Sequence, residues 1–408
     1  MRILSYLATV LIGASTIAPG ANLTVLHNFT SLSDGGYPLA GLTFDKTGAL
    51  YGSAETGGDF GVCDQGGACG VIFKLTPPAQ NGGAWNYTVL YDFFNQNLYP
   101  PSANLVFDGR GNLYGGAGND GTNAGSFQLT EASGNWTLNE IYSTGGGTPL
   151  IGKNANLYVI ANGMPGTCCG SVVQLAYSGG TWIPTVLYAF TGGDDGNMPV
   201  GGVVADTAGN LYGTASYGGA GDCGTVYELS PQAGGSWSET TLHSFMGSDG
   251  CSLSSGLIID KKGNLYGVTI TGGEGNCATG CGVVFELSPP AEPVGAWTES
   301  TLHYFQRSDG SNPLANLTMS SAGVLYGTTA SGGNGPCEPT GIGCGTIFKL
   351  VPPSQPGGTW TESFFPFNGT DGQGPQSTVL LDESTGALYG TARVGGAYGY
   401  GVVWQFLP

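Results

Sequence analysis

Positive charge is scarce in this 408-residue chain, which has 10 lysines and arginines against 28 aspartates and glutamates and a net charge of −18. Phosphate groups are bound by clustered lysine and arginine side chains, so this balance argues against nucleic acid and anionic membrane surfaces as partners. Beyond the first twenty residues the chain also lacks an apolar run long enough to cross a bilayer. We therefore expect no membrane insertion of the mature protein.

Histidine is equally rare, and all three histidines occupy one position of a repeated segment, two residues before a phenylalanine. The histidines are His27, His243 and His303, and the other copies of the segment carry Tyr91, Tyr142, Tyr188 and Phe365. Because phenylalanine and tyrosine lack ring nitrogens, we interpret this as a packing position. Ser-His-Asp and Cys-His catalysis then lack a base. Two GxGxxG matches lead into strands rather than a helix, so no cofactor is expected.

Glycine, in contrast, is abundant at 76 residues, and 40 per cent of the chain is hydrophobic. This combination indicates many tight turns between packed strands rather than disorder. The segment 199–245 serves as the unit of the chain, with four short apolar runs bounded by turn residues. They predict antiparallel strands at Val203–Asp206, Asn210–Ala215, Thr225–Leu229 and Trp237–Phe245.

Seven copies of this unit follow one another. A Leu-Tyr pair in the second strand recurs at intervals of 44 to 63 residues, followed by glycine in six copies and by Val159 in the third. Seven four-stranded units predict an all-β fold, a seven-bladed β-propeller, whereas a solenoid would need a more constant period. The predicted blade units are 38–93, 100–142, 149–190, 199–245, 253–305, 313–367 and 375–407 plus 23–29.

The two ends of the repeat array are complementary. The array opens on a lone fourth strand, Leu23–Phe29, and closes on a third strand, Gly401–Leu407. Pairing the two segments would complete the seventh blade and leave no open edge, so we predict that the ring closes in this way.

The first twenty residues have the pattern of a secretory signal. Arg2 precedes the apolar run Ile3–Ile12, and small residues follow it. We therefore expect a signal peptide at 1–20, a single propeller at 21–408, and a protein that is secreted, periplasmic or held at the cell surface.

These repeats resemble a known bacterial family, the GloVer tandem repeat. The resemblance rests on units such as LYGTASYGG, CGTVYELSP and LYGTTASGG, and it extends over nearly all of the mature chain. It implies an exported repeat protein with no established activity, and it supplies no catalytic residues.

Two sets of aspartates recur in the repeats. One set ends first strands in the pattern Asp-x-x-Gly, as at Asp45 and Asp108, and predicts tight hairpin turns. A second set precedes glycine in the loop after the fourth strand, where it forms turns or a ring of carboxylates around the channel mouth. Such a ring could bind sugar hydroxyls or calcium, although no metal is established. The second set is Asp34, Asp195, Asp249, Asp309 and Asp371.

The ten cysteines predict disulfides, because the count is even and the chain is expected to be exported. None forms Cys-x-x-Cys or has a histidine nearby, so zinc binding at the cysteines is not expected. Cys168 and Cys169 are adjacent and are left unassigned. The predicted pairs are Cys63–Cys69, Cys223–Cys251, Cys277–Cys281 and Cys337–Cys344.

Three functions are compatible with these patterns. The first is a non-catalytic binding module whose loop-rich face holds a neutral extracellular glycan or a protein. The second is a carbohydrate-active lyase or hydrolase with carboxylates at the channel mouth, and the third is a structural surface protein. An enzyme would need acidic residues that break the repeat, for which the variable loops offer Asp59, Asp64, Asp120, Glu274 and Glu338. The missing cofactor motif and the repeated histidine position favour the binding module.

Overall fold

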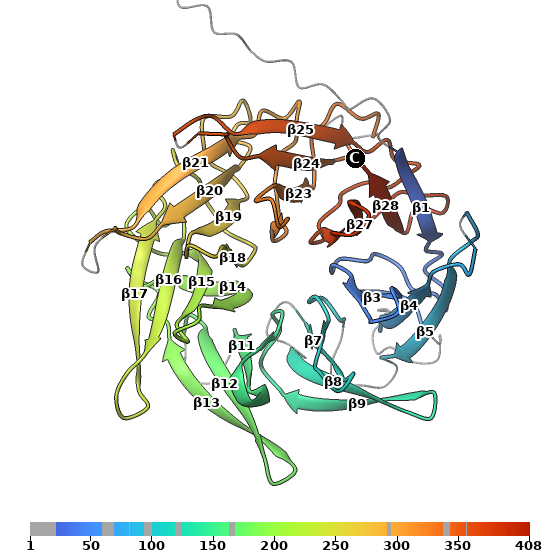
Figure 1. Ribbon diagram of the computed structural model, residues 1–408, viewed down its shortest axis with the longest axis horizontal. Coiled ribbons are helices and arrows are strands. Elements are labelled where there is room, and N and C mark those ends of the chain that lie inside the picture. The colour runs from blue at the N-terminus through green and yellow to red at the C-terminus, as the bar shows by residue number, and fades with distance from the viewer. Residues whose placement is uncertain are drawn as a thin grey trace, which may run out of the picture.

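The computed structural model describes residues 22–58, 69–80, 82–93, 100–118, 124–162, 168–291, 295–337, 343–355 and 357–408. In these ranges the chain forms seven four-stranded antiparallel sheets arranged in a ring (Figure 1). They contain no α-helix, and one 3-10 turn spans Lys153–Ala155. The predicted seven-bladed β-propeller is confirmed.

Each blade places its first strand toward the centre of the ring and its fourth strand at the outside (Figure 1). Blades 1 to 3 consist of β2 (Thr43–Phe44), β3 (Leu50–Ala54), β4 (Val71–Thr76), β5 (Asn86–Asp92); β6 (Val106–Phe107), β7 (Leu113–Ala117), β8 (Gly125–Ala132), β9 (Asn135–Tyr142); and β10 (Leu150–Ile151), β11 (Leu157–Ala161), β12 (Ser171–Ser178), β13 (Thr181–Ala189). Blades 4 and 5 consist of β14 (Asn197–Ala205), β15 (Leu211–Tyr217), β16 (Thr225–Pro231), β17 (Trp237–Ser244); and β18 (Ile258–Ile259), β19 (Leu265–Thr269), β20 (Val283–Ser288), β21 (Thr298–Tyr304). Blades 6 and 7 consist of β22 (Thr318–Met319), β23 (Leu325–Thr329), β24 (Thr346–Val351), β25 (Thr361–Pro366); and β26 (Leu380–Asp382), β27 (Ala387–Ala392), β28 (Val402–Leu407), β1 (Asn22–Asn28).

The ring closes where the sequence predicts. Strand β1 pairs antiparallel with β28, with Leu23 opposite Phe406 and Asn28 opposite Val402 (Figure 1). Directly after β1, the backbone N–H of Phe29 donates to the carbonyl of Gly401 at 3.0 Å. The seventh blade is therefore shared between the two ends of the repeat array, and β28 has a partner along its outer edge.

The glycine that follows Leu-Tyr makes room for an aromatic ring. Gly52 on β3 lies opposite Phe73 on β4, and a β-carbon on Gly52 would lie 2.6 Å from that ring. The same pairing recurs in the other copies that carry glycine, and the third blade instead pairs Val159 with Val173. Val159, the one departure from glycine at this position, is thus part of a volume exchange, in which its side chain fills space that an aromatic ring fills in the other blades.

The hydrophobic core lies between blades. Seven buried clusters each join residues of two neighbouring sheets, such as Tyr51 and Ile72 of blade 1 with Leu113 and Phe127 of blade 2. Every sheet is covered on both faces, so a blade is stable only with its neighbours, as in other repeat architectures.

The two ends of the ring carry different connections. At one end, Asp45 accepts the backbone N–H groups of Thr47 and Ala49 at 2.8 and 3.0 Å, which confirms the predicted Asp-x-x-Gly hairpin turn. Because the strands of a blade alternate in direction, the second-to-third loops and the loops between blades emerge at the opposite end. We call this end the loop-rich face.

Candidate functional site

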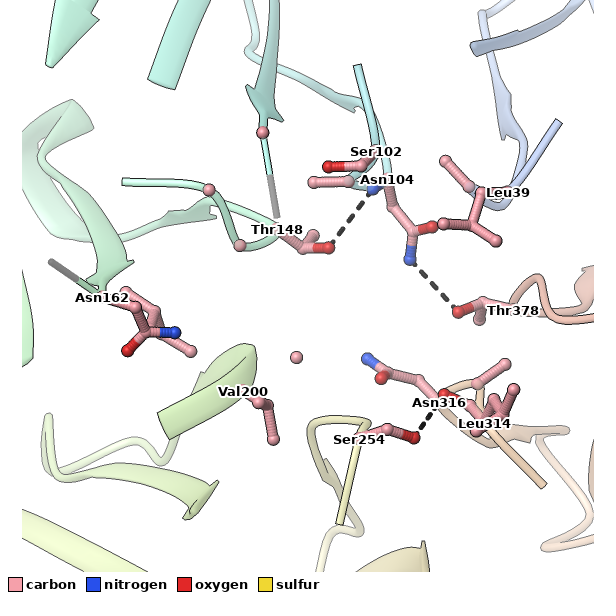
Figure 2. Close-up of a pocket in the computed structure, with 18 of the residues that line it drawn as sticks. Leu39, Ser102, Asn104, Thr148, Asn162, Val200, Ser254, Leu314, Asn316 and Thr378 are labelled. Carbon is pink, nitrogen blue, oxygen red and sulfur yellow. Dashed lines mark hydrogen bonds between the residues drawn. The ribbon is translucent and has the colours of Figure 1, made fainter. Parts of the chain in front are cut away.

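A pocket of about 350 Å³ lies at the centre of the ring (Figure 2). All seven blades contribute to it, mainly through the residues just before their first strands, as with Leu39, Ser254 and Thr378. Asn162, which follows the second strand of blade 3, also lines it. First strands begin and second strands end on the loop-rich face, so this central pocket opens there.

One wall of the central pocket is fixed by Asn104. Its side-chain carbonyl accepts the backbone N–H of Gly41 at 2.6 Å, and its amide donates to the hydroxyl of Thr378 at 3.1 Å (Figure 2). The backbone N–H of Asn104 donates to the hydroxyl of Thr148 at 3.3 Å. One side chain of blade 2 therefore reaches across blade 1 to blade 7. The missing side chain at Gly41 permits this, because a β-carbon there would lie 2.9 Å from Asn104 Oδ1.

The opposite wall is built by blades 4 to 6. The hydroxyl of Ser254 donates to the carbonyl of Leu314 at 3.0 Å, and the backbone N–H of Gly256 donates to Asn316 Oδ1 at 2.8 Å. The amide of Asn316 points toward the middle of the cavity (Figure 2). Close contact between blades at Gly201 and Gly256 leaves no room for a side chain, since a β-carbon on Gly201 would lie 1.8 Å from the nitrogen of Gly256.

The lining of the central pocket is polar but uncharged. None of the described residues that line it is ionisable. Amide and hydroxyl side chains are interspersed with aliphatic ones around the wall, and the polar residues are half-buried, as are Leu39, Val200 and Leu314. The polar lining residues with side-chain hydrogen-bonding groups are Ser102, Asn104, Thr144, Thr148, Asn162, Ser254, Asn316, Gln376 and Thr378. Such a wall offers donors and acceptors without fixed charge.

The five aspartates of the Asp-Gly loops lie elsewhere. None lines the central pocket, and the structure places them one per inter-blade loop rather than together. Each accepts a backbone N–H from the start of its own loop, as Asp195 does from Thr191 and Asp249 from Met246, both at 2.8 Å. These contacts are those of turn-forming aspartates. Their binding of sugar or calcium stays a prediction.

The position occupied by the three histidines contacts these aspartates. Nε2 of His27 lies 3.2 Å from Asp34 Oδ2, and Nε2 of His243 lies 2.9 Å from Asp249 Oδ2. In blade 3 the phenol hydroxyl of Tyr188 donates a hydrogen bond to Asp195 Oδ2 at 3.0 Å. Packing is also present, since the ring of His27 stacks on Tyr87 with centroids 3.9 Å apart. The interpretation as a packing position is therefore incomplete, because the position also supplies a polar partner to the loop.

A glutamate of the following blade approaches three of these pairs. Glu239, Glu299 and Glu362 occupy equivalent positions on β17, β21 and β25, each opposite a leucine of the third strand. Burial raises the pKa of all three carboxyls, and the charge of the neighbouring aspartate adds to the effect. The shift is largest at Glu362, where burial and Asp309 raise the pKa to about 8.

The cysteines form disulfides in the loops of the loop-rich face. The structure joins Cys223 with Cys251, Cys277 with Cys281 and Cys337 with Cys344, as the spacing predicts. Cys69 is disulfide-bonded, and its predicted partner Cys63 lies outside the described residues. The unassigned neighbours Cys168 and Cys169 are bonded to each other. Disulfides of this number are typical of proteins in oxidising compartments.

The acidic residues of the variable loops fall largely outside the description. Asp59, Asp64, Asp120 and Glu338 lie outside the described residues, and Glu274 is exposed on the loop after β19, away from the central pocket. Sequence reasoning missed the pocket residues, because they differ from copy to copy. A signal was present, however, in the copy-to-copy variation of the residues that precede each first strand, as at Leu39, Ser102 and Gln376.

Fold and site together define a closed seven-bladed β-propeller with a neutral central pocket. The chain belongs to the Gloeobacter/Verrucomicrobia repeat family, whose model matches residues 145–404. No curated protein matches the sequence. None of the described residues forms a helix long and apolar enough to span a membrane.

Several solved structures are similar in fold. A fungal alcohol oxidase of the AA5 family, in complex with copper, has a TM-score of 0.57 and 15% identity, with 94% of this chain and 75% of that chain covered. A putative 6-phosphogluconolactonase from Bacteroides uniformis has 0.53 and 15%, covering 84% and 96%. Polysaccharide lyase Uly1 has 0.53 and 10%, covering 91% and 90%. At these identities the likeness shows the propeller fold alone.

Proposed function

We propose that this protein is an exported binding module that holds a neutral glycan in the central pocket of its loop-rich face. The observation that carries the proposal is the uncharged lining of a 350 Å³ cavity by amides and hydroxyls such as Asn316, Gln376 and Thr378. Sugar hydroxyls both donate and accept hydrogen bonds, and these side chains match them on both counts. Export is supported by the signal-like first twenty residues and by the disulfides.

Acid–base catalysis is the alternative that the neutral lining disfavours. The solved structures with similar folds include a polysaccharide lyase and a putative lactonase, so an enzyme remains the competing hypothesis. Lyases and hydrolases move protons through ionisable groups placed beside the substrate. Among the described residues, those that line the central pocket offer amides and hydroxyls for this purpose and no carboxyl, imidazole or amine.

A glycan array with neutral and acidic glycans, followed by calorimetry on the best neutral ligand, tests the proposal. We expect saturable binding without turnover, and a loss of about tenfold or more when Val200→Phe narrows the pocket and Gln376→Ala removes a polar group. The matched control is Asp195→Asn with Asp249→Asn, which alters loops outside the pocket and should leave the affinity unchanged.

Three results would overturn the proposal. Binding that survives the pocket variants but is lost in the aspartate control would move the site to the Asp-Gly loops. Release of shortened or unsaturated glycan would make the protein an enzyme. An array with no neutral glycan bound would remove the ligand class.

A further inference from the structure

His303, Asp309 and Glu362 converge at the junction of blades 5 and 6. One ligating atom of each lies within 4.8 Å of the others. His303 lies on β21, Asp309 in the loop that follows it, and Glu362 on β25 of the next blade. None of the three lines the central pocket, and β21 and β25 are the outer strands of their blades. It therefore lies apart from the proposed glycan site.

Two atoms of this group are buried without a hydrogen-bond partner. They are Nε2 of His303 and Oε1 of Glu362. Nε2 lies 3.3 Å from Asp309 Oδ2 without forming a hydrogen bond, whereas the equivalent His243 bonds Asp249 at 2.9 Å. The other oxygen of Asp309 accepts the backbone N–H of Gln306 at 2.8 Å, which orients the free oxygen toward the histidine. Buried polar atoms normally have hydrogen-bond partners, so these two unpaired atoms require an explanation.

The neighbouring junctions show why Glu362 is different. On β17 and β21 the equivalent glutamates accept a hydrogen bond from a threonine two residues later, at 3.0 Å from Thr241 and 3.1 Å from Thr301. On β25 that residue is Phe364, which has no hydroxyl. The carboxylate of Glu362 thus loses the intrastrand donor that satisfies its counterparts.

The charges at this junction are also unbalanced. Two carboxylates face one imidazole, and across the described part of the chain no lysine or arginine forms an ion pair with either of them. Burying two carboxylates together is unfavourable unless a cation or a proton compensates them. One imidazole nitrogen with two carboxylate oxygens is a donor set suited to a divalent d-block metal, whereas calcium and magnesium prefer oxygen alone.

We propose that His303 Nε2, Asp309 Oδ2 and Glu362 Oε1 bind a divalent transition-metal ion, with Zn²⁺ as the preferred species, and so join blades 5 and 6. Three protein ligands leave one position of a tetrahedral zinc for water. The side chains of His303 and Asp309 are 18% and 12% exposed, so the group lies close to the surface, beside a loop of the loop-rich face.

The test uses the tag-free mature chain after removal of metals with a chelator. Calorimetry and elemental analysis with Zn²⁺ should show one ion per chain, weaker binding of Mn²⁺ and none of Ca²⁺. Glu362→Gln should weaken Zn²⁺ binding by at least tenfold. The matched control Glu299→Gln, at the junction whose glutamate keeps its threonine, should leave the zinc stoichiometry and affinity unchanged.

A second variant protects the test against misfolding. His303→Tyr introduces the residue that blade 3 carries at the same position, Tyr188, and should fold while losing Zn²⁺. Absence of saturable Zn²⁺ binding in the unmodified chain would overturn the proposal. A proton shared between His303 and the two carboxylates would then account for the unpaired atoms. Equal binding in the unmodified chain and in Glu362→Gln would overturn it as well.

Discussion

Removal of residues 21–30 should open the ring, because these residues supply the outer strand of the seventh blade. Phe29 is fully buried and meets Phe73 of blade 1 edge-on, with ring centroids 5.4 Å apart. Truncating such a phenylalanine to alanine costs about 3–5 kcal/mol. Leu23 and Val25 pack on the buried cluster between blades 6 and 7, and Leu26 packs on the cluster between blades 7 and 1 that contains Phe29. The deletion therefore costs more unfolding free energy than the loss of Phe29 alone. Since whole domains are stable by roughly 5–15 kcal/mol, most of the folding free energy is at stake.

Thermal melting by circular dichroism and size-exclusion chromatography would measure the effect of the deletion. We expect a sharply lower melting temperature, or oligomers formed through the exposed edge of β28. A synthetic peptide of residues 22–30 added in trans should restore stability, and a control peptide with serine at Val25 and Phe29 should not. An unchanged melting temperature together with a monomeric elution volume would refute the role of β1 in closure.

Three further perturbations follow from the described geometry. Replacing Cys223 and Cys251 with serine should cost roughly 3–4 kcal/mol in urea unfolding, because their bond spans 28 residues, and an unaltered midpoint would contradict this. Gly201→Ala should destabilise the fold by about 1–3 kcal/mol more than Gly209→Ala. Both glycines have positive φ, but only a β-carbon at Gly201 would clash with the next blade. Equal losses of unfolding free energy in the two variants would argue against this contact. Burial raises the pKa of Glu239, so the folded state holds this proton more tightly than the unfolded state does. The stability from this group is full below the unfolded pKa and is lost as pH rises, so Glu239→Gln should stabilise at pH 8 and not at pH 4, and a pH-independent difference in melting temperature would refute the assignment.

The sequence predicts best the structural features that all seven blades share. The alternation of apolar residues, the turn at Asp45 and the glycine at Gly52 all serve one sheet and its own hairpins, so they recur in the sequence and could be read from it. Strand bounds were less accurate. The strand predicted at Val203–Asp206 is β14, which begins earlier, at Asn197, ends at Ala205 and has an irregular register. A bulge of this kind leaves little trace in local composition.

Contacts between blades could not be predicted in the same way. The approach of Glu362 to His303 joins residues that are 59 positions apart, and its meaning depends on Phe364, which stands where the two other strands with this glutamate have a threonine. The hydrogen bond from Asn104 to Thr378 spans 274 positions. Both contacts exist only once the ring has closed and each blade has met its neighbours, so no pattern within a single repeat encodes them.

Departures from the repeat are therefore the best guide to function in this chain. A position that served packing alone would keep a similar volume in all seven copies or would change together with its packing partner, as Val159 and Val173 do. The first position of each blade at the pocket wall does the opposite, since it ranges from glycine to leucine and glutamine. In blade order these residues are Leu39, Ser102, Gly146, Val200, Ser254, Leu314 and Gln376. Their variation removes the sevenfold symmetry of the wall, with hydrogen-bonding side chains at some blades and apolar ones at others. An asymmetric wall can orient an asymmetric ligand, whereas a symmetric one could not select among its rotations.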